Sequence, residues 1–282
     1  MITVHISGGL GNQFFQYSAG RALAEKIDTE LKLDLRVYSN KRYLREYSLD
    51  NFEIKAKTSI SPKIDYVQYM FNRWLPIRYK TRIYGERQFS YDSNFDKLND
   101  STYLLGHWQS EKYFKRISNQ IRRELQYKQR LNDDYIKYKR MIYASNSVSL
   151  HIRRGDYVSN SNTNSVHGTC TLDYYYHALD IVSSKLSKPH VFVFSDDINW
   201  ARKNCKFKTK TTFVTTEKPD ANQEIEIMKH CKHSIIANSS YSWWGAWLNE
   251  YKGKIVIAPD KWFNDQSLDT TDLIPQRWLR VK

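Results

Sequence analysis

Two adjacent arginines, Arg153 and Arg154, follow an apolar run at residues 147–150 and precede Gly155 and Asp156. The run alternates as a buried strand does and leads into a glycine turn. In an open α/β sheet, ligands bind at the carboxyl ends of the strands. Two guanidinium groups there can hold a diphosphate by bidentate hydrogen bonds. We therefore favour a metal-free site for a phosphorylated substrate over an ordinary surface pair of basic residues.

A second polar cluster, Asp196 and Asp197, follows the apolar residues 190–194 of the same half of the chain. Acids at the end of a strand can bind ribose hydroxyls or orient a nucleotide base. The alternative is that Ser195 or Asp196 caps the helix expected at residues 198–204. We expect capping to be part of their role and leave the ligand contact open.

A third cluster, ANSSYSWWGAW at residues 237–247, joins an apolar strand to a helix. Backbone N–H groups and hydroxyls at a helix N-terminus are suited to cradle a phosphate. Trp243 and Trp247 share a helix face at i, i+4 spacing, so we expect those two to pack in the core. The polar residues of this turn are Asn238, Ser239, Ser240 and Ser242.

The first glycine turn, residues 8–13, lies between a strand and a helix. The dinucleotide fingerprint G-x-G-x-x-G would need a third glycine where this chain has Phe14. Asp34, which ends the second strand, would suit a ribose diol, so an NAD(P)-dependent oxidoreductase that uses Gly9 and Gly11 is an alternative. A tight turn alone is equally compatible, although the polar pair Asn12 and Gln13 indicates a ligand.

Composition limits the class of protein. The chain has 282 residues, 40% hydrophobic and 15% aromatic, which is enough for one large domain or two ordinary ones. Its net charge of +14 favours an acidic partner, but the basic residues are dispersed, so we do not expect nucleic acid binding. Three cysteines without a C-x-x-C pair indicate a reducing compartment and no zinc site.

The remaining segments predict location and fold. No stretch of about 18 apolar residues is present, so we expect a cytoplasmic protein. We expect the basic, aromatic residues 66–82 to form a packed helix, to contact the inner face of a membrane or to contact the acceptor. Alternating strands and helices predict an α/β fold with two Rossmann-like lobes that face a cleft. We place the N-terminal lobe at 1–145, including the charged helical stretch 111–143, and the C-terminal lobe at 146–282.

Four motifs occur in order along the chain: GGLGNQFFQY at 8–17, HIRRGDY at 151–157, FSDD at 194–197 with Trp200, and NSSYSWWGAW at 238–247. Together they resemble bacterial α-1,2-fucosyltransferases, glycosyltransferase family 11. The resemblance implies a GT-B-type fold, a GDP-fucose donor, inversion of configuration, and no divalent metal or other cofactor. It carries little information over residues 40–145, where the acceptor is usually selected.

The resemblance also implies residue roles. The arginines would grip the diphosphate, and Asn12 would face the reaction centre from the N-terminal lobe. The acceptor would be the 2-hydroxyl of a terminal β-galactose on a surface polysaccharide repeat, free or lipid-linked. The candidate catalytic residues are Arg153, Arg154, Asp156, Asn12 and His167; because the acceptor hydroxyl has a high pKa, a base would assist transfer, and it would be Asp156, His167 or neither. The residues assigned to GDP are His151, Arg153, Arg154, Asp196, Asp197, Asn238, Ser239, Ser240, Ser242, Gly9 and Gly11.

Overall fold

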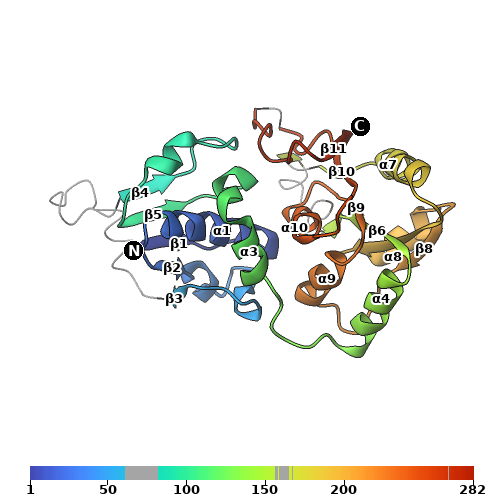
Figure 1. The fold of residues 1–282 in the computed structure, drawn as a ribbon, viewed down its shortest axis with the longest axis horizontal. Coiled ribbons are helices and arrows are strands. Elements are labelled where there is room, and N and C mark those ends of the chain that lie inside the picture. Colours follow the sequence, from blue (N-terminus) through green and yellow to red (C-terminus); the bar gives the residue numbers. More distant parts are fainter. Residues whose placement is uncertain (61–81, 156–157, 159–164, 167, 266) are drawn as a thin grey trace. The chain divides into compact units, whose positions relative to one another are not determined.

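A computed structural model of the chain describes residues 1–60, 82–155, 158, 165–166, 168–265 and 267–282. The chain forms two compact units (Figure 1). Unit 1 comprises Met1–Lys128 with Asp269–Leu273, and unit 2 comprises Gln129–Leu268 with Ile274–Lys282. Each unit is built on one parallel sheet with helices, as the alternation of strands and helices predicts.

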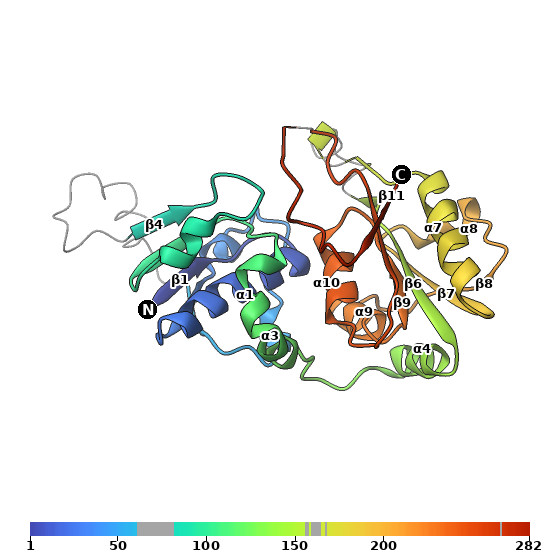
Figure 2. The ribbon, with the colours of Figure 1, turned by 45° about the horizontal axis from the view of Figure 1, so that its top comes forward.

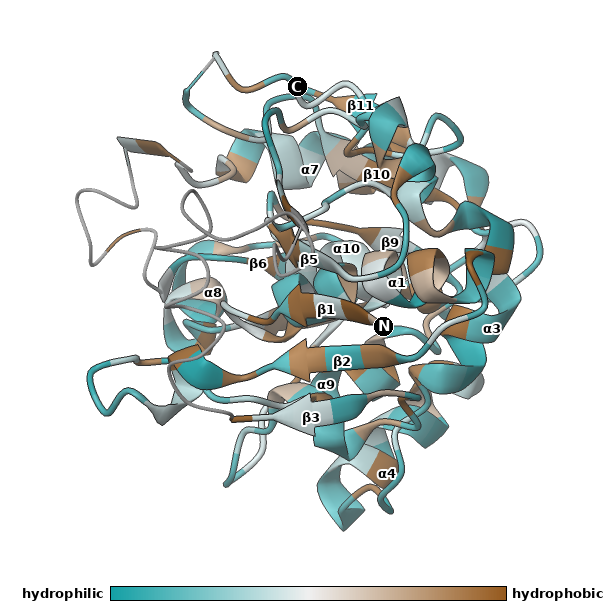
Figure 3. Ribbon diagram, turned by 90° about the vertical axis from the view of Figure 1, so that its left-hand side faces the viewer, coloured by the Kyte–Doolittle hydropathy of each residue, from teal (hydrophilic) through white to brown (hydrophobic). Residues whose placement is uncertain are grey.

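Unit 1 contains a five-stranded parallel sheet in the order β3-β2-β1-β5-β4. Its strands are β1 (Ile2–His5), β2 (Leu31–Asp34), β3 (Lys57–Ser59), β4 (Arg82–Gly85) and β5 (Thr102–Leu105). The order reverses between β1 and β5, so the switch point of this sheet lies at the carboxyl ends of those two strands. The inner strand β1 carries more hydrophobic residues than the edge strand β3 (Figure 3).

Helix α1 (Leu10–Lys26) connects β1 to β2 and is buried on nearly all sides. Its polar residues Gln13 and Gln16 are fully buried as well. The helix packs closely on the sheet, because a Cβ atom at Gly20 would lie 2.2 Å from the side chain of Val4. Unit 1 also contains helix α3 (Ser118–Glu124) and short 3-10 turns at Glu111–Tyr113 and Lys115–Ile117.

Unit 2 contains a six-stranded parallel sheet in the order β11-β10-β9-β6-β7-β8. Figure 2 shows its strands β6, β7 and β8 together with helices α7 and α8. The strands are β6 (Asn146–Ile152), β7 (Pro189–Ser195), β8 (Lys210–Phe213), β9 (His233–Ile235), β10 (Val256–Pro259) and β11 (Leu279–Val281). The helices are α4 (Asp133–Tyr143), α7 (Leu172–Lys185), α8 (Ile198–Asn204), α9 (Ala221–Met228) and α10 (Ser240–Leu248).

The central strand β6 is buried on both faces, as expected for a strand inside a parallel sheet. Val148 and Leu150 belong to a core that includes Tyr174, Ala178 and Val182 of α7. This packing fixes the carboxyl end of β6, where the two arginines follow.

The boundary between the units differs from the predicted 145/146. Helix α4 packs in unit 2, where the Tyr138 hydroxyl donates to the carbonyl oxygen of Thr215 (2.9 Å). Conversely, Asp269–Leu273 belongs to unit 1, where the Ser110 hydroxyl donates to the carbonyl oxygen of Asp272 (2.8 Å). The charged pattern of residues 111–143 predicts helices but does not reveal which sheet each one covers.

The structure can be compared with the expectations about the membrane and the cysteines. Within the described ranges, no helix is long and apolar enough to cross a membrane. The stretch 66–82 lies outside the described residues except for its last one, so the structure does not bear on its proposed membrane contact. All three cysteines, Cys170, Cys205 and Cys231, are free thiols.

Candidate functional site

The paired arginines and aspartates meet at the carboxyl ends of β6 and β7. These strands pair in parallel with Ile152 opposite Ser195, so the residues that follow them are neighbours. Nη1 of Arg153 lies 2.9 Å from Oδ2 of Asp196. The other carboxylate oxygen of Asp196 accepts the backbone N–H of Arg154 (2.8 Å). One aspartate therefore fixes both the side chain of Arg153 and the backbone of Arg154.

The guanidinium of Arg154 is held mainly by stacking. Its Cζ lies 3.7 Å from the ring centroid of Trp200, a close cation–π contact. Nε lies 3.6 Å from Oδ2 of Asp197, beyond hydrogen-bond distance, and has no hydrogen-bond partner among the described residues. The stacking orients the guanidinium plane without occupying the N–H group at Nε.

Gly155 allows the close approach of Asp196 to this cluster. A Cβ atom at position 155 would lie 2.5 Å from Oδ2 of Asp196, the oxygen that pairs with Arg153. Any side chain at this position would push the carboxylate away. The glycine that the sequence suggested as a turn former thus also shapes the ion pair.

The helix after β7 is capped differently from our expectation. Asp197 is the N-cap of α8, and its side chain accepts the backbone N–H of Trp200 (3.1 Å). Ser195 accepts the backbone N–H of Asp197 (3.0 Å). The expected cap by the segment 195–197 is confirmed, but Asp197 provides it instead of Ser195 or Asp196, and Asp196 pairs with Arg153.

His151, next to the arginines in sequence, is 4% exposed. Burial lowers the pKa of its imidazole to about 4, so the ring is neutral near pH 7. Its Nδ1 atom has no hydrogen-bond partner in the part of the chain that the structure describes. The ring packs 5.5 Å from that of Tyr241, in the first turn of α10. His151 thus connects the end of β6 to the serine-rich turn.

The serine-rich turn places Ser239 at the N-cap of α10 and Ser240 at its first helical position. Ser242 is fully buried, and its hydroxyl lies 3.4 Å from the carbonyl oxygen of Ala237 and 3.3 Å from that of Ser239. That hydroxyl is directed at the backbone of the turn. The helix N-terminus, not the Ser242 side chain, is the anion-attracting feature here.

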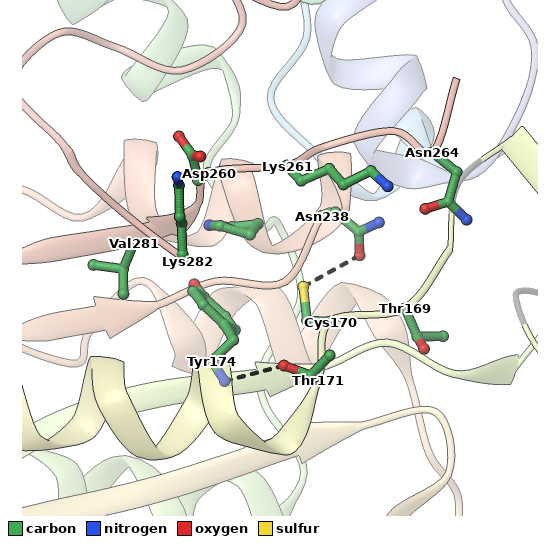
Figure 4. A pocket seen from close by; sticks show the side chains of 11 residues that line it. Thr169, Cys170, Thr171, Tyr174, Asn238, Asp260, Lys261, Asn264, Val281 and Lys282 are labelled. Carbon is green, nitrogen blue, oxygen red and sulfur yellow. Dashed lines mark hydrogen bonds between the residues drawn. The ribbon is translucent and has the colours of Figure 1, made fainter. Parts of the chain in front are cut away.

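Asn238 joins two loops of unit 2. Its Nδ2 donates to the carbonyl oxygens of Gly168 and Trp262 (both 3.1 Å), and its Oδ1 accepts from the thiol of Cys170 (3.5 Å). The same loops enclose a pocket of about 360 Å³ beside α7 (Figure 4). The sequence predicts that Asn238 binds the ligand. In the structure its amide side chain links the two loops, and the ligand contact stays a prediction.

The three tryptophans of α10 are all core residues. Trp243, Trp244 and Trp247 are at most 1% exposed. Trp243 stacks on Trp247 with ring centroids 6.2 Å apart and also contacts Trp278 (5.3 Å). The expected core role of Trp243 and Trp247 is confirmed, and it extends to Trp244.

In unit 1 the glycine turn is braced by amide side chains. Nε2 of Gln13 donates to the carbonyl oxygens of Gly8 (3.0 Å) and Glu46 (2.8 Å), and its Oε1 accepts the N–H of Ser48 (2.9 Å). Gln13 therefore holds neighbouring loops, and our interpretation of it as a ligand contact is wrong. Nε2 of Gln109 donates to Oδ1 of Asn12 (2.9 Å).

Gly9 and Gly11 lie at the start of α1. Gly9 is its N-cap, and among the described residues no atom lies within 4 Å of the place where a Cβ atom would be. Its backbone can therefore be approached closely. Gly11 is buried in the first turn of the helix.

Asp34, the carboxylate that the oxidoreductase alternative requires, is occupied. Nε of Arg36 donates to both of its oxygens (2.9 and 2.8 Å), and the Tyr103 hydroxyl donates to Oδ2 (2.6 Å). Burial opposes ionisation, but these hydrogen bonds outweigh it and hold the pKa of Asp34 below its usual value. Asp34 is therefore not open to a ribose diol.

Glu224 of α9 was missed in the sequence. Burial, opposed by a hydrogen bond from Tyr135 and reinforced by the charges of Asp220 and Asp196, raises its pKa to about 7. Glu224 is half-buried, and a single glutamate in an amphipathic helix gives no sign in the sequence that its carboxyl is desolvated.

Glu224 should make the stability of the protein depend on pH. The folded state retains its proton up to about pH 7, whereas the unfolded state releases it near 4.5. The stabilisation is thus complete below pH 4.5 and is lost as pH rises through 7, by about 3 kcal/mol at most. In Glu224→Gln this loss should disappear, which urea unfolding at pH 5 and pH 8 would measure. The exposed Glu217 gives a control, Glu217→Gln, and parallel pH curves for all three proteins would contradict the raised pKa of Glu224.

Two predicted residues, Asp156 and His167, lie outside the described residues. Within the described ranges, no group of three or more His, Cys, Asp or Glu side chains is arranged to hold a metal ion. The structure thus brings together Arg153, Arg154, Asp196 and Asp197, and places His151 beside the serine-rich turn.

The family model described as glycosyl transferase family 11 matches residues 1–282. The chain is 34% identical over 289 residues to an α-1,2-colitosyltransferase of Escherichia coli, with 100% of this chain and 99% of the relative covered. It is 33% identical to the O-antigen biosynthesis glycosyltransferase WbnK of Escherichia coli (95% and 97% covered). It is 22% identical to the galactoside 2-alpha-L-fucosyltransferase Sec1 of Mus musculus (88% and 64% covered).

These matches define the protein as a glycosyltransferase with two α/β units. The chain belongs to glycosyl transferase family 11. Membership confirms the resemblance carried by the four motifs and leaves the oxidoreductase alternative without support.

Proposed function

We propose that the protein transfers L-fucose from GDP-fucose, with inversion, to the 2-hydroxyl of a terminal β-galactose during O-antigen synthesis. The observation that carries the proposal is the pair Arg153 and Arg154, fixed by aspartates at the carboxyl end of β6 in a family 11 chain. The names of the relatives support the α-1,2 linkage, the galactoside acceptor and the O-antigen context.

The arginines supply the electrostatic part of the mechanism. As the glycosidic bond breaks, the sugar gains oxocarbenium character and negative charge grows on the leaving GDP. Donors that are already oriented stabilise this charge without reorganisation. Asp196 and the ring of Trp200 provide that orientation, the first for Arg153 and the second for Arg154. Neutralisation by guanidinium groups in this way requires no divalent metal.

The remaining donor contacts are assigned from position. The N-terminus of α10, with Ser239 and Ser240, attracts a phosphate through its backbone N–H groups. His151, neutral and buried, supports this turn from β6. Asp156 and His167 remain the candidates for a base that accepts the proton of the acceptor hydroxyl.

The two units have separate roles in this scheme. Unit 2, which contains most of the predicted lobe 146–282, binds GDP-fucose. Unit 1, which contains most of 1–145, receives the acceptor and brings Gly9, Gly11 and Asn12 to the reaction. We place the enzyme in the cytoplasm, at the inner face of the membrane if the acceptor is lipid-linked.

A GDP-release assay tests the proposal. GDP-fucose is offered with a panel of β-galactosides, with and without EDTA, and GDP-colitose serves as the competing donor because colitose is fucose without its 3-hydroxyl. We expect galactoside-dependent GDP release from GDP-fucose that EDTA does not reduce. Loss of activity in EDTA would contradict metal-free catalysis. Transfer from GDP-colitose but not from GDP-fucose would show that the donor sugar is colitose, as the name of the Escherichia coli relative states for that protein.

A further inference from the structure

A loop in unit 1, residues 106–110, lies at the switch point of its sheet. It follows β5, the neighbour of β1, and the start of the glycine turn, at Gly8 and Gly9, follows β1. In open parallel sheets, ligands bind at the carboxyl ends of the strands where the strand order reverses. The loop and the glycine turn are therefore the two segments of unit 1 best placed to touch a substrate.

The backbone of this loop is strained. Trp108 has φ of +56°, a left-handed conformation that is unfavourable for a bulky residue. The residue is fully buried, with its ring between Tyr84 (6.0 Å) and Tyr113 (5.4 Å). Strained backbone persists only where the surroundings determine it, and it is concentrated at functional sites.

Glu86 determines this conformation. Its Oε2 accepts the backbone N–H of His107 (2.7 Å), and its Oε1 accepts that of Trp108 (2.9 Å). Gly106 is required for the approach, because a Cβ atom there would lie 2.5 Å from Cβ of Glu86. Burial raises the pKa of Glu86 despite these two hydrogen bonds. A partly desolvated carboxylate thus accepts hydrogen bonds from two consecutive backbone N–H groups, and both bonds are charge-assisted.

The clamped loop is joined to Asn12. Gln109 is 7% exposed, and its Nε2 donates to Oδ1 of Asn12 (2.9 Å). Gln16 binds the start of the same loop through the carbonyl oxygen of Gly106 (3.1 Å). Because Oδ1 of Asn12 accepts from Gln109, the donor end of the Asn12 amide is directed at the glycine turn. A Cβ atom at Gly8 would lie 2.6 Å from that Nδ2.

We infer that Glu86 and Gln109 are positioning residues for the acceptor side of the reaction. Glu86 holds the loop, and Gln109 fixes the orientation of the Asn12 amide at the switch point. The inference rests on the proposed function, in which Asn12 faces the reaction centre. It adds two residues, distant in sequence from Asn12, that act through it.

The test is a double-mutant cycle with Glu86→Gln and Asn12→Ala. The glutamine offers one acceptor where the clamp needs two, so the loop should relax and misplace Asn12. We expect kcat for galactoside transfer to fall about 10- to 100-fold, with the KM for GDP-fucose unchanged. In the Asn12→Ala background the same change should cost less than about twofold, because the group it positions is gone. Glu30→Gln, at the exposed ion pair of Glu30 with Lys57 (2.6 Å), is the control.

Hydrogen exchange provides a readout that does not depend on activity. In Glu86→Gln, the amides of His107 and Trp108 should lose protection, while those of β1 keep theirs. Equal losses of kcat in the presence and absence of Asn12 would show a general effect on folding and overturn the inference. If Glu86→Gln has wild-type kinetics, the inference is overturned but the proposed function stands. If the wild-type protein is inactive with every donor, both the proposed function and the inference are overturned.

Discussion

Replacing Arg154 or Arg153 with alanine should lower kcat/KM for fucosyl transfer about 10²–10³-fold. Each guanidinium stabilises negative charge on the leaving GDP, and each is already oriented, Arg153 by Asp196 and Arg154 by Trp200. The measurement is GDP release under subsaturating GDP-fucose for each variant. Turnover near that of the wild type in both variants would refute the assignment of these arginines to the diphosphate.

Two further variants separate geometry from charge. Arg154→Lys keeps the positive charge but loses the planar fork and the stacking on Trp200, so we expect it to recover little activity. Arg202→Ala removes a neighbouring arginine of α8 whose guanidinium lies 5.7 Å from the ring of Phe213, and it should leave kcat/KM nearly unchanged. Full rescue by lysine would mean that a point charge suffices.

The arginine–aspartate cluster contains as many carboxylates as guanidinium groups. Two arginines face Asp196 and Asp197, so the cluster has little net charge before the donor arrives. Its contribution is therefore orientation as much as attraction. The long-range attraction of a diphosphate is left to the overall charge of +14, which is spread over the surface.

The sequence was sufficient to predict this cluster because it depends on strand ends. The apolar runs at β6 and β7 identify both strands, and parallel pairing places the residues that follow them side by side. In contrast, β3, β4 and β11 were not predicted, since they have only three or four residues each and little apolar alternation. Their place in the sheets is set by tertiary pairing.

Side-chain partners distant in sequence explain the other errors. Gln13 looked like a ligand residue because its partners, Glu46 and Ser48, lie in a segment without a readable pattern. Likewise, the position of Asp34 fits a ribose contact, and only the structure shows that Arg36 occupies it. A polar residue in a glycine turn binds a ligand or braces a loop, and its type alone does not distinguish the two.

The replacement of Trp243 with alanine should destabilise the protein by about 3–5 kcal/mol. Its side chain is fully buried and its ring contacts those of Trp244 (5.1 Å), Trp247 and Trp278. The substitution would therefore leave a cavity among the three remaining rings. The helix that Trp243 anchors also carries the serine-rich turn. The variant should therefore lose activity at a lower temperature than the wild type does. Urea unfolding followed by circular dichroism measures the effect without relying on tryptophan fluorescence.

Trp200→Ala is the matched control, because it removes the same side chain from a half-buried position. The ring of Trp200 is covered by Arg154 (3.7 Å) and lies at the margin of the unit 2 core. Its loss should lower kcat/KM through a misplaced guanidinium while reducing the free energy of unfolding much less than Trp243→Ala does. An unfolding free energy equal to that of the wild type in Trp243→Ala would show that α10 is not held by its tryptophans. In that case Trp243→Ala would not be less stable than Trp200→Ala, and contacts other than the tryptophans would have to fix the N-terminus of α10 at the phosphate.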